Sequence, residues 1–338
     1  MENAESTYNQ FLKPSRELIA DLTRLEGDII ILGAGGKMGP GLAAVAKQAC
    51  HEAGIKKRII AVARFSEAGL ADRFNQLGIE TISTDLLNKD QLRSLPDIQN
   101  VIYLAGTKFG TRGNEPYTWA MNTYLPSQVA DHFKHSNIVV FSTGNVYPMT
   151  PVVQGGATEH HSLEPVGEYA QSCLGRERIF QYFSQINHTP LLIFRLNYAN
   201  DVSYGVLLEI AKSVKSSKPI DLNMGNVNVI WQGDANEMAI RSLLHCSTPA
   251  KLLNITGPET ASVRWIAEEF GRIFNETPHF TGEEQPTALL NNAAESFKLF
   301  GYPKVGLKQM MELLAHWLME GGKTINKETH FQERKGNF

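Results

Sequence analysis

A run of aliphatic residues that leads straight into a glycine-rich loop is the feature that most constrains the fold of this chain. Residues 29–32 read Ile-Ile-Ile-Leu, the next seven residues contain four glycines, and a helical pattern follows over residues 42–53. This arrangement is typical of a buried strand that turns tightly into a helix, where backbone N–H groups can bind the pyrophosphate of a dinucleotide. The residues expected to hold such a cofactor are Gly33, Gly35, Gly36, Lys37, Met38 and Gly39.

The same alternation of strand and helix continues along the first two hundred residues. Further short β-branched runs, separated by helix-length segments, lie at residues 58–63, 80–83, 100–104, 137–142 and 190–195. Parallel neighbours need crossover connections of this length. The sequence therefore predicts an α/β protein with a Rossmann-type, doubly wound parallel sheet over residues 26–200, to which residues 226–248 return.

The length of the chain predicts a second unit. With 338 residues, it exceeds the roughly 150 of one ordinary domain. Beyond residue 200 the alternation loosens, and we expect a small C-terminal α/β lobe that covers the substrate, built from residues 201–225 and 249–321. Residues 1–25 are expected to form an N-terminal arm, and the polar residues 322–338 a tail on the surface.

The charge balance and the cysteine content narrow the class of partner. Lys and Arg number 32 and Asp and Glu 35, a net charge of −3, so there is no global electrostatic reason to bind nucleic acid or an anionic membrane. No signal peptide or long apolar stretch is found, and we expect a cytoplasmic protein with a small-molecule substrate. Three scattered cysteines predict neither a disulfide framework nor a metal site.

The residues after the second and third strands bear on the cofactor. Ala63 and Arg64 stand where an NAD-preferring site places a carboxylate on the ribose 2′-hydroxyl. A guanidinium can bind a 2′-phosphate instead, which favours NADP over NAD, whereas stacking of Arg64 on the adenine is the alternative. Asp85 and Leu86 are expected beside the adenine, unless Asp85 only caps a helix.

Several further motifs accompany the glycine loop. They are Asp85-Leu86, residues 103–106 (Tyr-Leu-Ala-Gly), Asn122, residues 141–147, residues 168–172, and the later segments 233–235 and 253–257. Together they resemble the extended short-chain dehydrogenase/reductase family, the NAD-dependent epimerases and dehydratases, over about residues 28–320. The resemblance implies an NAD(P)-dependent oxidoreductase or epimerase that acts on a hydroxyl or ketone carbon of a sugar-like or other small polyhydroxylated substrate, and it raises the expectation of a homodimer.

The resemblance also assigns the chemistry to particular residues. Thr143 would hydrogen-bond the substrate hydroxyl, and Tyr169 would act as general acid and base while hydride moves to or from the nicotinamide. A structural helix tyrosine is the alternative for Tyr169, and a buried strand-end amide is the alternative for Asn197. The remaining assignments are Ala105, Gly106, Lys108 and Tyr169 to the cofactor, and Phe109, Asn122, Asn145 and Asn197 to the substrate.

Cys173 stands four residues after Tyr169, where the family has a lysine. A cation about 4 Å from the phenol, at an effective dielectric constant near 20, is worth ~4 kcal/mol, or roughly three pKa units. Three interpretations are open. Lys108 supplies the cation, Cys173 is a proton relay or redox-sensitive group, or Cys173 only fills space in a non-catalytic NAD(P)-binding sensor or partner-binding protein. Arg176 and Arg178 are expected to point to other helix faces, in solvent.

One more departure concerns the substrate. Family members that bind nucleotide-diphosphate sugars carry an arginine seven residues before the aspartate that matches Asp234, and this chain has Val227 there. Neither Asn226 nor Asn228 can replace a bidentate phosphate clamp. The sequence therefore predicts a smaller polyhydroxylated or carbonyl compound in place of a nucleotide sugar.

Overall fold

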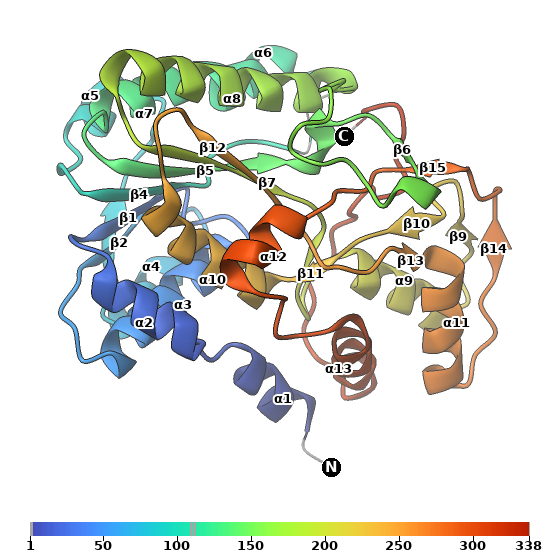
Figure 1. Ribbon diagram of the computed structural model, residues 1–338. Coiled ribbons are helices and arrows are strands. Elements are labelled where there is room, and N and C mark those ends of the chain that lie inside the picture. The colour runs from blue at the N-terminus through green and yellow to red at the C-terminus, as the bar shows by residue number, and fades with distance from the viewer. Residues whose placement is uncertain (1–2, 109, 111–112, 338) are drawn as a thin grey trace.

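A seven-stranded parallel sheet forms the centre of the molecule (Figure 1). The computed structural model describes residues 3–108, 110 and 113–337. The strands lie in the order β12-β7-β5-β4-β1-β2-β3, and every neighbouring pair is parallel. Their bounds are β1 (Ile29–Leu32), β2 (Ile59–Ala63), β3 (Glu80–Ser83), β4 (Asn100–Tyr103), β5 (Asn137–Thr143), β7 (Leu191–Leu196) and β12 (Lys251–Ile255). The predicted Rossmann-type sheet is confirmed.

Helices cover both faces of this sheet. Successive side chains of a strand point to opposite faces, and so Ile29 and Ile31 join one core while Ile30 and Leu32 join the other. The first face is covered by α2 (Arg16–Arg24), α3 (Gly39–Glu52), α4 (Leu70–Gln76) and α10 (Gln232–Arg241). The second is covered by α5 (Lys89–Arg93), α7 (Leu125–His132) and α8 (Gly167–Asn187), with α6 (Glu115–Trp119) and a π-helical turn (Ala120–Tyr124) leading into α7.

A smaller lobe has a separate hydrophobic core. Its helices are α9 (Val206–Lys215), α11 (Val263–Phe274) and α13 (Leu307–Met319), while α12 (Ala294–Phe300) lies between it and the sheet. Its strands are all two residues long: β6 (Thr150–Pro151), β8 (Ala199–Asn200), β9 (Ile220–Asp221), β10 (Asn226–Val227), β11 (Ile230–Trp231), β13 (Ala261–Ser262), β14 (Phe280–Thr281) and β15 (Thr287–Ala288). The lobe is therefore held together mainly by helix packing.

The N-terminal segment contacts both lobes. α1 (Ala4–Phe11) packs on the small lobe, where the Tyr8 ring lies 6.0 Å from the ring of Trp231. α2 packs on the sheet domain through Leu18 and Leu22, which are both buried. The segment predicted as an arm thus consists of two docked helices.

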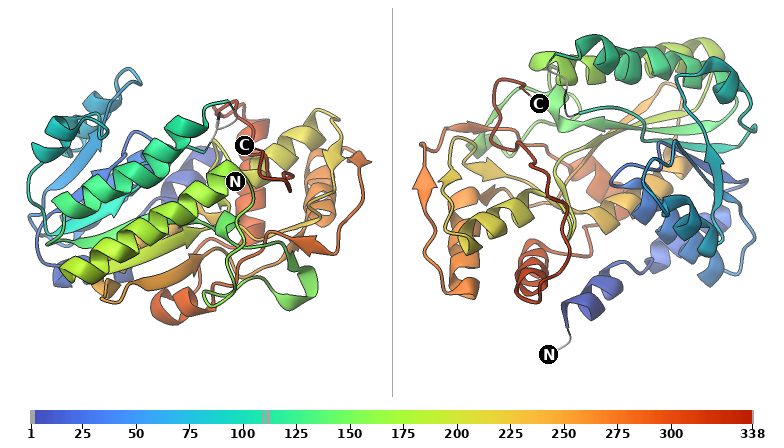
Figure 2. Two further views of the ribbon diagram at one scale, coloured as in Figure 1. Left: turned by 90° about the horizontal axis from the view of Figure 1, so that it is seen from above. Right: turned by 180° about the vertical axis from the view of Figure 1, so that it is seen from behind.

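The C-terminal segment after α13 runs back along the small lobe toward the sheet domain (Figure 2). Phe331 is only 1% exposed, and the side-chain hydroxyl of Thr329 donates to Glu209 at 2.6 Å. Arg334 donates to the hydroxyl of Thr287 at 2.6 Å. The segment predicted as a surface tail has no helix or strand in its described residues, and its contacts with the small lobe bury Thr329 and Phe331. No helix among the residues described is both long and apolar enough for a membrane crossing.

Candidate active site

The cleft forms at the carboxyl end of β1, in the middle of the sheet. β1 lies between β4 and β2, where the strand order reverses, and doubly wound sheets bind nucleotides at such a point. Gly33 follows β1 with φ +88°, and a Cβ on it would lie 2.7 Å from the backbone nitrogen of Ala105. A Cβ on Gly39 would overlap the backbone of Ala34. These two glycines therefore let the loop pack closely against the chain after β4 and let the start of α3 fold back on the loop.

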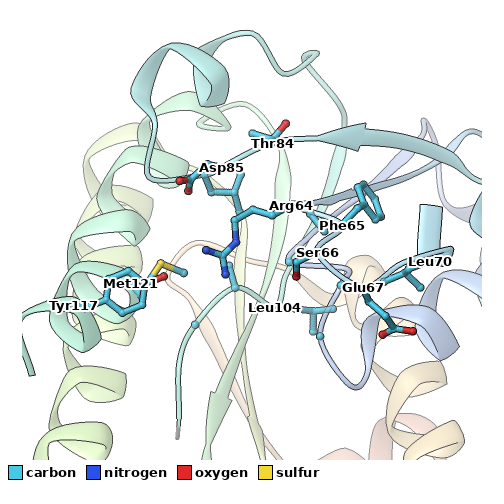
Figure 3. A pocket seen from close by; sticks show the side chains of 17 residues that line it. Arg64, Phe65, Ser66, Glu67, Leu70, Thr84, Asp85, Leu104, Tyr117 and Met121 are labelled. Carbon is cyan, nitrogen blue, oxygen red and sulfur yellow. The ribbon is translucent and has the colours of Figure 1, made fainter. Parts of the chain in front are cut away.

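A cavity of about 270 Å³ extends from the glycine loop toward β2 and β3 (Figure 3). Arg64 extends into it from the end of β2, with Asp85 on one side and Met121 and Tyr117 beyond. Asn88, not Asp85, caps α5, so the alternative of Asp85 as the helix cap does not apply. The predicted cofactor residues that line this cavity are Gly33, Gly35, Gly36, Arg64, Asp85, Leu86, Ala105 and Gly106.

A second cavity, of about 470 Å³, lies between the sheet domain and the small lobe. It adjoins the first, since Gly33, Gly36, Leu104 and Gly106 line both. The predicted site residues that line it are Gly33, Gly36, Lys37, Met38, Gly39, Gly106, Lys108, Thr143, Asn145, Tyr169 and Asn197. Phe109, predicted to contact the substrate, lies outside the described residues. One cleft thus joins the glycine loop to the predicted catalytic residues.

Tyr169 and Thr143 meet at the wall of the second cavity. Thr143 ends β5, Tyr169 lies in the first turn of α8, and their hydroxyls form a hydrogen bond. Burial and the neighbouring Cys173 raise the pKa of the Tyr169 phenol, while the charge of Arg176 and the bond to Thr143 lower it in part. Tyr169 is therefore a neutral phenol at neutral pH, able to donate a proton.

Cys173 lies one helical turn beyond Tyr169 and is fully buried. Its thiol forms a hydrogen bond with the Tyr169 hydroxyl and packs among Val146, Tyr147 and Ala157. Cys173 does not line either cavity. Burial raises the pKa of this thiol. A buried neutral thiol is a poor nucleophile, so the packing interpretation of Cys173 is favoured over the redox one.

Two cations flank the phenol. The Lys108 ammonium lies 5.8 Å from the centroid of the Tyr169 ring, and burial lowers its pKa to about 8. Arg176 is 6% exposed, and its guanidinium donates to the carbonyl of Phe141 at 2.9 Å and to Asn122 at 2.7 Å. The expectation that Arg176 lies in solvent is wrong, because seven residues are about two helical turns and return it to the face of Tyr169.

Asn122, which was expected to contact the substrate, is buried behind the cleft. It is fully buried in the π-helical turn and lines neither cavity. Its amide oxygen accepts from the Thr107 backbone nitrogen and from Arg176, and its nitrogen donates to the Thr107 carbonyl and to Ser172. All four hydrogen-bonding positions of the amide are used. Asn122 therefore fixes the loop that carries Lys108 and does not face a substrate.

The family-model match decides the wider identity of the chain. The NAD dependent epimerase/dehydratase family model matches residues 29–222, more than half of the sequence. The chain belongs to this family. No curated protein matches the sequence. At the level of fold, UDP-glucuronic acid 4-epimerase from Bacillus cereus, solved in complex with NAD, has a TM-score of 0.71 with 19% identity, over 88% of this chain and all of the other (100%).

Two further solved structures share the fold at similarly low identity. dTDP-glucose 4,6-dehydratase from Bacillus anthracis, in complex with NAD, has a TM-score of 0.71 with 16% identity, over 87% of this chain and 97% of that one. UDP-glucose 4-epimerase from Thermotoga maritima has a TM-score of 0.69 with 12% identity, over 87% and 99%. These neighbours act on nucleotide sugars, so the comparisons do not support the predicted exclusion of such substrates.

Position 227, where an arginine is expected in nucleotide-sugar enzymes, does not face the second cavity. Val227 is fully buried in β10, and Asn228 is bonded to Asn197 and to the carbonyl of Asn291. Neither Val227 nor Asn228 lines the second cavity, whereas Asn197 does. A nucleotide diphosphate, if bound, would need another positive group.

Sequence reasoning missed several residues that line the second cavity. Tyr204 precedes α9, Gln232 begins α10, and Lys327 and Thr329 come from the C-terminal segment. No motif marks them, because they reach the cavity only through contacts between distant parts of the chain. Arg176 had a usable signal in its helical spacing from Tyr169.

Proposed function

We propose that the protein is an NAD(P)-dependent oxidoreductase or epimerase that acts on a hydroxyl-bearing or ketone carbon of a sugar-like substrate. One observation carries this proposal: the hydroxyls of Tyr169 and Thr143 are hydrogen-bonded at the wall of a cavity that the glycine loop also lines. A bound dinucleotide supplies hydride transfer to or from the substrate carbon. The protein supplies the proton.

The glycine loop fits a dinucleotide. Side chains at Gly33 and Gly39 would clash with the backbone of Ala105 and Ala34, so these positions fix the tight path of the loop into α3, whose first turn presents backbone N–H groups to a pyrophosphate. Arg64 enters the adjoining cavity where the adenosine would lie, and a guanidinium there favours the 2′-phosphate of NADP. Two structural neighbours were solved with NAD bound, and NAD is therefore the alternative cofactor.

Tyr169 acts as the proton donor in the reductive direction. Its raised pKa keeps the phenol protonated, so it can protonate the oxygen of a carbonyl that is being reduced while Thr143 holds that oxygen. In the oxidative direction the phenol must first lose its proton. The charges of Arg176 and Lys108 favour that loss, and they stand in for the lysine that Cys173 replaces.

The test uses the full-length protein loaded with NAD⁺ or NADP⁺ and a panel of aldoses, sugar acids, sugar phosphates and nucleotide sugars. Reduced cofactor is followed by absorbance, and epimer formation by proton NMR of the sugar, which resolves the two epimers. We expect Tyr169→Phe to abolish turnover and to leave cofactor binding intact. Tyr182→Phe is the matched control, because Tyr182 lies on the same helix and is 57% exposed.

Three results decide between the alternatives. Turnover that survives in Tyr169→Phe contradicts the catalytic role. Tight cofactor binding without turnover of any panel member favours a non-catalytic NAD(P)-binding sensor or partner-binding protein. A fluorescence titration with NADH and NADPH, repeated on Arg64→Gln, tests the cofactor preference, since loss of selectivity for NADPH is expected only if Arg64 binds the 2′-phosphate.

A further inference from the structure

Three lysines from distant parts of the chain converge on the second cavity. Lys37 belongs to the glycine loop, Lys108 to the loop after β4, and Lys327 to the C-terminal segment. Among the described residues that line this cavity there is no Asp or Glu. The cavity between the two lobes therefore carries a concentrated positive charge in a protein whose net charge is −3.

Lys37 reaches across the cleft. Its ammonium lies 3.0 Å from the centroid of the Tyr204 ring, which belongs to the small lobe. Burial, and then the charges of Lys327 and Lys108, lower the pKa of Lys37 to about 7. Lys37 is partly buried and Lys327 is exposed at the rim, and an anion bound between them would offset the cost of holding the Lys37 charge near the other lysines.

The C-terminal segment holds Lys327 in place. On one side of it the Ile325 backbone nitrogen donates to the carbonyl of Ser203 at 2.8 Å. On the other side the backbone nitrogen and hydroxyl of Thr329 both donate to Glu209, at 2.8 and 2.6 Å. Because residues on both sides of Lys327 are anchored to the small lobe beside Tyr204, its position at the cavity is part of the fold.

We propose that Lys37 and Lys327 form a subsite for an anionic group of the substrate, a carboxylate or a phosphate monoester, with the C-terminal segment supplying half of it. The proposal rests on the proposed function and names the class of substrate. Lys108 lies beside Tyr169, so an anion held between the other two lysines fixes the orientation of the substrate carbon relative to the phenol. The pyrophosphate of the cofactor is the competing source of negative charge.

The experiment measures binding without turnover. Full-length protein saturated with its cofactor is titrated calorimetrically with inorganic phosphate and with glucuronate, and glucose serves as the uncharged probe. We expect both anions to bind and glucose to bind at least about tenfold more weakly. Lys327→Gln should weaken both anions about tenfold and leave the dissociation constant of the cofactor unchanged. Lys323→Gln is the matched control, since it removes the same charge from the same segment at an exposed residue that does not line the cavity.

Any of three results overturns the subsite. The first is that neither anion binds the wild-type holoprotein. The second is that Lys327→Gln binds them as the Lys323→Gln control does. The third is that Lys37→Gln and Lys327→Gln weaken the cofactor but not the anions, which assigns the lysines to the pyrophosphate. Because no step depends on Tyr169, a failure of the proposed catalytic function remains distinguishable: anions would still bind although Tyr169→Phe changed nothing.

Discussion

A buried ion pair behind the site offers the sharpest test of how the cleft is held. Glu177 of α8 and Arg195 of β7 are 0% and 1% exposed. Arg195 donates through Nε and Nη2 to the two carboxylate oxygens, at 2.9 and 2.6 Å. Glu177 also accepts from Ser142 at 2.5 Å, and Arg195 donates to the hydroxyl of Tyr147 at 2.6 Å. Ser142 directly precedes Thr143, so the pair fixes the strand end that carries the predicted catalytic hydroxyl.

Glu177→Gln keeps the shape of the side chain and removes its charge. Arg195 would then be buried without a counterion, and breaking a buried pair in this way costs about 3–5 kcal/mol. With unfolding entropy of about 2.1 cal/mol/K per residue, the 338 residues of this chain give roughly 700 cal/mol/K. We therefore expect the melting temperature to fall by roughly 4–7 °C. A double variant, Glu177→Met with Arg195→Met, should lose less than the two single losses added, because no unpaired charge remains.

The assay is thermal unfolding followed by circular dichroism, with a matched exposed pair as control. Arg58 and Glu80 also pair at 2.9 Å, but their side chains are 50% and 43% exposed. A pair of that kind is worth about 0–1 kcal/mol, so Glu80→Gln should shift the melting temperature by less than about 1.5 °C. If Glu177→Gln melts as Glu80→Gln does, the reasoning from burial is refuted.

Three other predictions follow from the cleft. Gly33→Ala should weaken NADH binding by at least about tenfold in a fluorescence titration, because the new Cβ would lie 2.7 Å from the Ala105 nitrogen; unchanged affinity would contradict the shape argument. Arg176→Met should raise the pKa of Tyr169 and so move the rising limb of the oxidative pH–rate profile to higher pH, with partial rescue in Arg176→Lys; an unmoved limb would exclude the electrostatic role. Because the pKa of Lys37 is lowered to about 7, its ammonium is lost as pH rises, so glucuronate affinity should fall between about pH 6 and 8, and this fall should be absent in Lys37→Gln.

The parts of the fold that sequence reasoning predicted are those that local patterns determine. The strand ending at Leu32, the glycines after it and the helix from Gly39 are adjacent in the chain, and their geometry follows from short-range sterics. Thr143 and Tyr169 were predicted through their motifs, and both line the second cavity. The alternation of strands also predicted the sheet, because parallel pairing requires the crossovers.

The residues that were missed depend on long-range contacts. Thr329 is held by Glu209, 120 positions earlier in the chain, and no periodicity in a polar C-terminal stretch predicts such a bond. Asn122 was expected at the substrate because its motif was read without its partners, yet Arg176 and Thr107 use its amide completely. Whether such a side chain faces the substrate cavity or holds a neighbouring loop depends on the packing around it, and one sequence does not reveal that packing.

The burial of Arg176 bears on whether the replacement of the family lysine by Cys173 would remove catalytic activity. Its Nε has no hydrogen-bond partner among the described residues, and an unsatisfied buried donor is costly. Its other guanidinium nitrogens donate to the Phe141 carbonyl and to Asn122, so Arg176 has a structural role beside the site. The guanidinium also lies where its charge lowers the pKa of both Tyr169 and Cys173. Under the proposed function a phenol that must ionise gains from this charge, so Arg176 supplies part of the positive charge that the family lysine would bring at position 173.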